Sequence, residues 1–157
     1  ESDIGWMLGV FLLASSLASS LSASFWGWAA DTSSRRVMIR GAAMASSVCL
    51  VVGVLALVLG PGFGGAWFYP VAFFVLSIAH AGVRLGRKTY LVDMAGGNKR
   101  TDYTAVSNTV IGVLLLVTGG FTAAISMISD VAVILVLGLM GLAGMLSALR
   151  LEEVTED

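Results

Sequence analysis

A carboxylate and two guanidinium groups lie close together in a short polar stretch between two apolar runs. Asp31 is followed four and five residues later by Arg35 and Arg36, and Gly27 precedes it by four residues. A carboxylate at this spacing can form an ion pair with either arginine, or it can face the positive N-terminal end of another helix. Gly27 has no side chain, so a second helix can approach closely there. These residues therefore form the first candidate site; the alternative is a turn aspartate beside arginines that only fix membrane topology.

His80 and Arg84 form a second candidate site. They are four residues apart and therefore share one face of a helix. A histidine titrates near neutral pH, so His80 is a candidate proton-responsive gate; the alternative is an interfacial side chain with satisfied hydrogen bonds. Arg84 could also join Arg87, Asp93 and Asp102 in a charge network, although topology signals explain the basic members equally well.

Hydroxyl-bearing side chains form a third candidate. Ser16, Ser20 and Ser24 are four residues apart and make one stripe along a helix. One interpretation is close helix packing; the other is the polar wall of a substrate path, because hydroxyls contact a solute without the cost of burying charge. Ser107 and Asn108 allow the same two interpretations. Five glycines further along are interpreted as packing or bending points: Gly119, Gly120, Gly138, Gly141 and Gly144.

The chain lacks the sequence patterns that predict catalysis or cofactor binding. It has no His/Cys cluster for a metal and no Gly-x-Ser-x-Gly nucleophile turn, and its single cysteine, Cys49, is interpreted as a small packing residue. The net charge of -1 provides no basic field for nucleic acid. We therefore expect neither enzyme activity nor a metal, cofactor or nucleic-acid partner. Four acidic residues near the C-terminus predict a solvated tail: Glu152, Glu153, Glu156 and Asp157.

The elements that must position these residues are membrane helices. Hydrophobic residues make up 57% of the chain and charged residues 12%, and the mean hydropathy is +0.92, whereas a soluble domain carries about a quarter charged residues. The apolar residues form long charge-free runs of about 20 residues, enough for a helix to cross roughly 30 Å of hydrocarbon. The expected fold is an all-α polytopic bundle of five transmembrane helices with the lipid bilayer around it. The expected spans of this single domain, 1–157, cover about 4–29, 37–59, 66–83, 103–128 and 131–149.

The basic residues predict the orientation of the bundle. Threading five spans places all nine Lys and Arg on one side, in the first and third connections and after the last span. Basic residues concentrate in cytoplasmic loops. The C-terminal tail is therefore expected in the cytoplasm.

The first connection resembles the signature G-x-x-x-D-[RK]-x-G-[RK]-[RK] of the major facilitator superfamily of transporters. Four positions match: Gly27, Asp31, Arg35 and Arg36. Thr32 replaces the first basic residue, and Ser34 replaces the second glycine. The resemblance implies a secondary active transporter of a small solute, in which Asp31 helps to latch the cytoplasmic helix ends during alternating access.

Members of that family have twelve spans in two six-helix halves, with such a loop between the second and third helix of each half. Five spans with the loop after the first fit helices two to six or eight to twelve, and the departures from the signature and the acidic tail favour the second half. The chain starts at Glu1 without an initiator methionine or a basic leader, so we expect an excerpt of a longer polypeptide. The expected partners are then the remaining helices of the transporter and a solute, with or without a coupling ion, in a bacterial inner membrane. The alternative function is a non-transporting membrane scaffold or assembly subunit.

Overall fold

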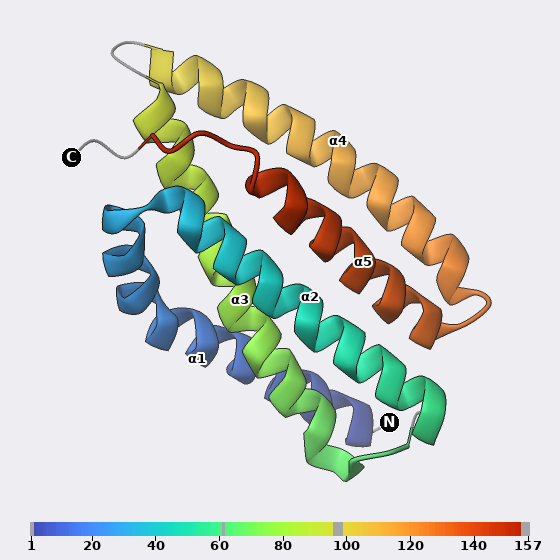
Figure 1. The fold of residues 1–157 in the computed structure, drawn as a ribbon. Helices are drawn as coiled ribbons and strands as arrows, with labels where there is room; N and C mark the ends of the chain where they lie inside the picture. Colours follow the sequence, from blue (N-terminus) through green and yellow to red (C-terminus); the bar gives the residue numbers. More distant parts are fainter. Residues whose placement is uncertain (1, 61, 96–98, 155–157) are drawn as a thin grey trace.

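The computed structural model describes residues 2–60, 62–95 and 99–154, in which every regular element is an α-helix. The helices are α1 (Ser2–Thr32), α2 (Ser34–Leu59), α3 (Gly65–Met94), α4 (Arg100–Ser126) and α5 (Asp130–Ala148). Successive helices run in opposite directions (Figure 1). The predicted all-α fold with five helices is confirmed.

Each of the five helices is long and apolar enough to cross a membrane. The shortest, α5, has 19 residues and the longest, α1, has 31, or about 28 and 46 Å at about 1.5 Å per residue. Large apolar side chains cover their outer surfaces; Leu116 is 80% exposed and Ile128 is 87% exposed. Such a surface suits lipid or further apolar protein better than water. The predicted membrane bundle is thus supported by helix number, length and surface.

The first connection is shorter than predicted. Only Ser33 separates α1 from α2, and its side chain caps α2 by accepting a hydrogen bond from the backbone N–H of Arg36 at 3.1 Å. Because the cap satisfies a donor of the first turn, α2 starts at Ser34 rather than at the predicted Val37. Asp31, expected in the connection after residue 29, belongs instead to the last turn of α1.

The third helix is longer than predicted. Its expected end was Val83, but α3 continues to Met94, so the expected polar loop of residues 84–102 becomes mostly helix. Arg and Lys are good helix formers, and polar residues mark where a helix leaves lipid, not where it ends. His80 consequently lies at the middle of α3 rather than at its end. Residues 96–98 of the expected loop lie outside the described residues.

The bundle is built around α2, which lies between α3 and α5, while α1 packs on α3. Helix α4 lies at the edge next to α5 (Figure 1). None of its described residues is buried. The helices therefore form a core of four and one peripheral member.

Glycines permit the closest helix contacts. A Cβ atom at Gly41 of α2 would lie 3.0 Å from the Ala79 carbonyl oxygen of α3, and one at Gly138 of α5 would lie 2.9 Å from Leu50 of α2. A hydrogen bond strengthens the second contact, because the Ser46 hydroxyl donates to the Gly138 carbonyl at 2.6 Å. Small residues that let backbones approach, joined by hydroxyl bonds, are typical of helix contacts in membranes.

All nine Lys and Arg lie in one half of the bundle, toward the end where α1, α3 and α5 finish and α2 and α4 begin. We call this the basic end. The opposite end carries the α2–α3 and α4–α5 turns (Figure 1). The placement of the basic end in the cytoplasm stays a prediction.

Candidate functional site

The α1–α2 junction places the predicted latch residues at the basic end, but it does not pair them as expected. Asp31 is exposed, and among the described residues it forms no ion pair with Arg35 or Arg36. Arg35 instead donates from Nη2 to the carbonyl oxygen of Leu149 at 2.7 Å. The exposed Arg36 contributes its backbone N–H to the Ser33 cap. Of the two arrangements considered for Asp31, the ion pair with Arg35 or Arg36 is therefore not formed among the described residues.

Gly27 does not mediate a helix contact within the described part of the chain. A Cβ atom built there would meet nothing within 4 Å. The adjacent residue, Trp26, makes the contact instead: it is 5% exposed, and its indole N–H donates to the Ile78 carbonyl at 2.9 Å. The ring packs against Gly82, where a Cβ atom would lie 2.6 Å from Trp26 Cε2. The close contact between helices that was expected at Gly27 is thus made by the neighbouring residue, Trp26.

A segment after α5, residues 149–153, crosses the basic end; we call it the tail segment (Figure 1). The Ser33 hydroxyl lies 2.9 and 2.8 Å from the two carboxylate oxygens of Glu153 and donates to them. Tyr90, near the end of α3, donates its hydroxyl to the Glu152 carbonyl at 3.1 Å. The prediction of a purely solvated tail is wrong for this segment, while Glu156 and Asp157 lie outside the described residues.

Glu153, rather than Asp31, places a carboxylate beside the positive N-terminal end of a helix. Its carboxylate bonds to the residue that caps α2, close to the positive N-terminal end of that helix, where a negative charge is favourable. Asp31 lies at the C-terminal end of α1, where a negative charge is unfavourable. Sequence spacing favoured Asp31 because Glu153 is 120 residues away from Ser33.

The predicted charge network does not form among the described residues. Asp93 accepts a hydrogen bond of 3.4 Å from the Ser34 hydroxyl rather than from an arginine, and Asp102 lies in the first turn of α4. Arg87 Nη1 and Arg35 Nε are buried and have no hydrogen-bond partner. Buried donors without partners are rare and costly, so the basic end has unused capacity for hydrogen bonds to an acceptor.

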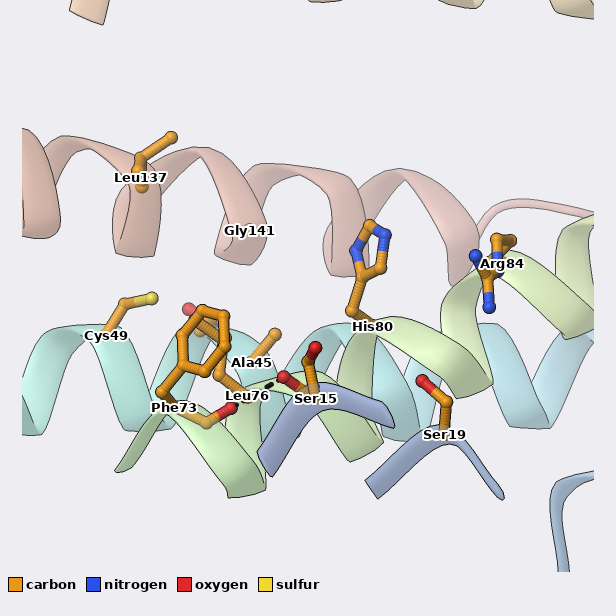
Figure 2. A pocket seen from close by; sticks show the side chains of 12 residues that line it. Ser15, Ser19, Ala45, Cys49, Phe73, Leu76, His80, Arg84, Leu137 and Gly141 are labelled. Carbon is orange, nitrogen blue, oxygen red and sulfur yellow. Dashed lines mark hydrogen bonds between the residues drawn. The ribbon is translucent and has the colours of Figure 1, made fainter. Parts of the chain in front are cut away.

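His80 and Arg84, which were predicted to share a helix face, line the same cavity. The cavity has a volume of about 530 Å³ and lies among α1, α2, α3 and α5. In Figure 2 both side chains extend from α3 on the side that faces α5, while Ser15 and Ser19 come from α1. Two further hydroxyls, of Ser46 and Ser77, complete its polar lining. Its apolar lining includes Phe73, Leu76, Leu137 and the thiol-bearing Cys49.

The predicted serine stripe lies elsewhere. Ser16, Ser20 and Ser24 are all exposed, whereas Ser15 and Ser19 line the cavity. One residue along an α-helix is a rotation of about 100°, since a turn takes 3.6 residues, so adjacent serines face different surroundings.

The predicted pair on α4 also lies away from this cavity. Ser107 is half-buried and Asn108 is exposed, and neither lines it. Both belong to the peripheral helix, whose contacts with α3 and α5 are few.

The described residues contain no group of three or more His, Cys, Asp or Glu that could hold a metal ion. Comparison of the chain with family models, curated proteins and solved structures finds no match. The site is therefore defined by two features of the bundle itself: the polar junction at the basic end and the cavity among four helices.

Proposed function

We propose that this chain is part of a secondary active transporter that moves a small solute by alternating access, and that its five helices belong to a six-helix half of the major facilitator type. Two features support this proposal. The resemblance of the α1–α2 junction to the family signature is the first, and the polar-lined cavity among four membrane-length helices is the second. The departures from the signature, at Thr32 and Ser34, and the acidic tail favour helices eight to twelve of the second half.

The observation that carries the proposal is the state of the α1–α2 junction. Asp31 is exposed there without an ion-pair partner among the described residues. The buried Nε of Arg35 also lacks an acceptor. A latch that closes in only one state of a transport cycle requires such residues to be available in the other state, and we assign their partners to the other half of the transporter.

The orientation proposed for this transporter places the basic end and the tail segment in the cytoplasm, in a bacterial inner membrane. All nine Lys and Arg lie toward that end, and basic residues are retained on the cytoplasmic side during insertion.

A matched pair of glycine variants tests the proposal. Neither Gly27 nor Gly144 has a described atom within 4 Å of a built Cβ, so a side chain at either position begins in open space and the two leucine variants are matched. We expect Gly27→Leu to abolish solute-evoked currents of the reconstituted protein on a solid-supported membrane, assayed with a panel of organic anions, cations and sugars. Gly144→Leu should retain them, because only Gly27 lies beside the latch.

Asp31→Asn provides the second arm of this experiment. We expect it to slow transport and to change the fraction of protein whose basic end is open, because a neutral amide cannot form the charged latch bond. Unchanged flux and an unchanged conformational equilibrium in Asp31→Asn would remove the latch role.

A scaffold or assembly subunit is the second candidate, and the surface of α4 favours it. The helix buries no described residue, and apolar surface of that size suits a partner helix as well as lipid. A scaffold would produce no solute-evoked current from any member of the panel, and it would respond equally to leucine at Gly27 and at Gly144.

A further inference from the structure

Two ionisable side chains of α3 lie in, or at the end of, its apolar length. The membrane-length part of α3 runs from Trp67 to Met94, and about 20 residues, or roughly 30 Å, counted from Trp67 reach Gly86. His80 falls inside this length, and Arg84 lies near its end, where the polar residues of α3 begin. Ionisable residues inside a membrane span are costly and mark solute or ion pathways when they face a cavity; both of these line the cavity of about 530 Å³.

Of the aspartate, glutamate, histidine, lysine and arginine side chains, only basic ones line this cavity. The residues lining it include Arg84 and His80 but no aspartate or glutamate. Neither basic side chain has a hydrogen-bond or ion-pair partner among the described residues. Both side chains are exposed and therefore accessible to a ligand, and an anion that accepts their hydrogen bonds forms charge-assisted bonds with them. The missing counter-charge therefore points to an anionic ligand.

Three of the four cavity serines already use their hydroxyl protons. Ser15 donates to the Leu12 carbonyl at 3.0 Å, Ser46 to the Gly138 carbonyl at 2.6 Å and Ser77 to the Phe73 carbonyl at 2.8 Å. Figure 2 shows the last of these bonds as a dashed line. The donors left for a ligand are Ser19, His80 and Arg84; in the view of Figure 2, Ser19 on α1 lies below His80 and Arg84 on α3.

The other side of the cavity is apolar and continues into a second cavity. Four residues line both: Cys49, Phe73, Leu76 and Leu137. The second cavity has a volume of about 360 Å³, and nearly all of its remaining lining is apolar, with Phe11, Val52 and Ile134 among its members. The two cavities together offer hydrogen-bond donors in the first and an almost entirely apolar lining in the second.

We propose that the joined cavities bind an amphipathic organic anion, with its acidic group at Arg84, His80 and Ser19 and its apolar body over Phe73, Leu76 and Leu137. The proposal deepens the transport proposal by naming a substrate class; it rests on that function for movement of the anion and on the cavity alone for binding. A soluble aromatic acid and an anionic lipid share this chemistry.

Cys49 provides a test on the unmodified protein, because this thiol lines both cavities. The protein in phosphatidylcholine nanodiscs is treated with methyl methanethiosulfonate, and modification of Cys49 is followed by peptide mass spectrometry. We expect 4-phenylbutyrate to slow the reaction several-fold, while 4-phenylbutanol and 4-phenylbutylamine, which share its apolar body, do not. Protection by phosphatidylglycerol in place of phenylbutyrate would support the anion site and assign its ligand to the lipid.

Arg84→Gln tests the charged end. Loss of a hydrogen bond to a charged group predicts an affinity for phenylbutyrate lowered by about tenfold or more, measured by calorimetry, with binding of the alcohol unchanged. Arg40→Gln is the matched control, because Arg40 is exposed on α2 and does not line the cavity. If Arg84→Gln does not yield folded protein, His80→Gln and the protection of wild-type Cys49 still decide the question.

Each remaining outcome separates this inference from the proposed function. Equal protection by the acid, the alcohol and the amine, or protection by none of them, overturns the anion site. Solute-evoked currents without anion binding leave the transporter standing and remove this substrate class. Arg84-dependent anion binding without currents from any solute keeps the site and removes the transporter.

Discussion

Two tryptophans show how strongly burial depends on the position of a residue along a helix in this bundle. Trp26 is 5% exposed and hydrogen-bonded across the α1–α3 contact, whereas Trp28 is 71% exposed. Hydropathy treats them alike, and both lie near the basic end, where either could be an interfacial aromatic. What distinguishes them is Gly82, the residue on α3 that leaves room for one indole ring.

Alanine at Gly82 is expected to destabilise the bundle. Its Cβ would lie 2.6 to 2.9 Å from three ring atoms of Trp26, and overpacking of this kind costs about 1–3 kcal/mol, against about 1 kcal/mol gained in helix propensity. Thermal unfolding in detergent, followed by size exclusion, should show a lower midpoint for Gly82→Ala. Gly144 has open space around it, so the unfolding midpoint of Gly144→Ala should match or exceed that of the wild type. Equal shifts of the midpoint in the two variants would argue against the Trp26 contact.

At the scale of elements, the tail segment joins helices that are distant in sequence. Through Leu149, Glu152 and Glu153 it bonds to the start of α2 and the end of α3. These helix ends are the parts that must move if the basic end opens and closes in a transport cycle. The tail segment therefore favours the conformation seen here over any in which those ends separate.

A double-mutant cycle measures this link. We expect Ser33→Ala to lower the free energy of unfolding by about 1–2 kcal/mol, because it removes both the helix cap and the hydrogen bond to Glu153. Glu153→Ala should lower the free energy of unfolding by less, since Ser33 still caps α2. The double variant should show an interaction energy between the two side chains of about 0.5–1.5 kcal/mol. Glu152→Ala is the control, because Tyr90 bonds to its backbone carbonyl rather than to its side chain. Strict additivity of Ser33→Ala and Glu153→Ala in thermal unfolding would show that the bond contributes nothing.

At the scale of the whole molecule, hydropathy and charge define how the bundle sits in a membrane. The helices alternate in direction, and the Lys and Arg all lie toward one end. The cost of moving charged side chains across lipid keeps such an arrangement in one orientation.

Cysteine labelling in intact cells checks that orientation. In a Cys49→Ala background, a cysteine at Gly62, in the α2–α3 turn, should react with a membrane-impermeant maleimide added outside. A cysteine at Lys99, just before α4, should react only after lysis if the basic end faces the cytoplasm, as we propose. Labelling of both positions, or the reverse pattern, would contradict the proposed topology.

The sequence by itself was sufficient for the number of helices and for the end of the bundle that carries the basic residues. Both follow from local properties, since a run of about 20 apolar residues must form a helix in lipid to satisfy its backbone groups. The shared helix face of His80 and Arg84 followed from their spacing in the same way. Helix ends were less well predicted: α3 continues past Val83 to Met94, because polarity reports contact with water while helicity depends on backbone bonding.

Only the tertiary structure decided which residues meet. Asp31 and Arg35 are near neighbours in sequence, yet Arg35 bonds to Leu149 and Ser33 bonds to Glu153. Ser15, rather than Ser16, faces the cavity. Such pairings depend on the rotation of each helix and on the path of the chain after α5. The physical reason is that partition into lipid constrains each segment independently, whereas a contact depends on the packing of several helices at once.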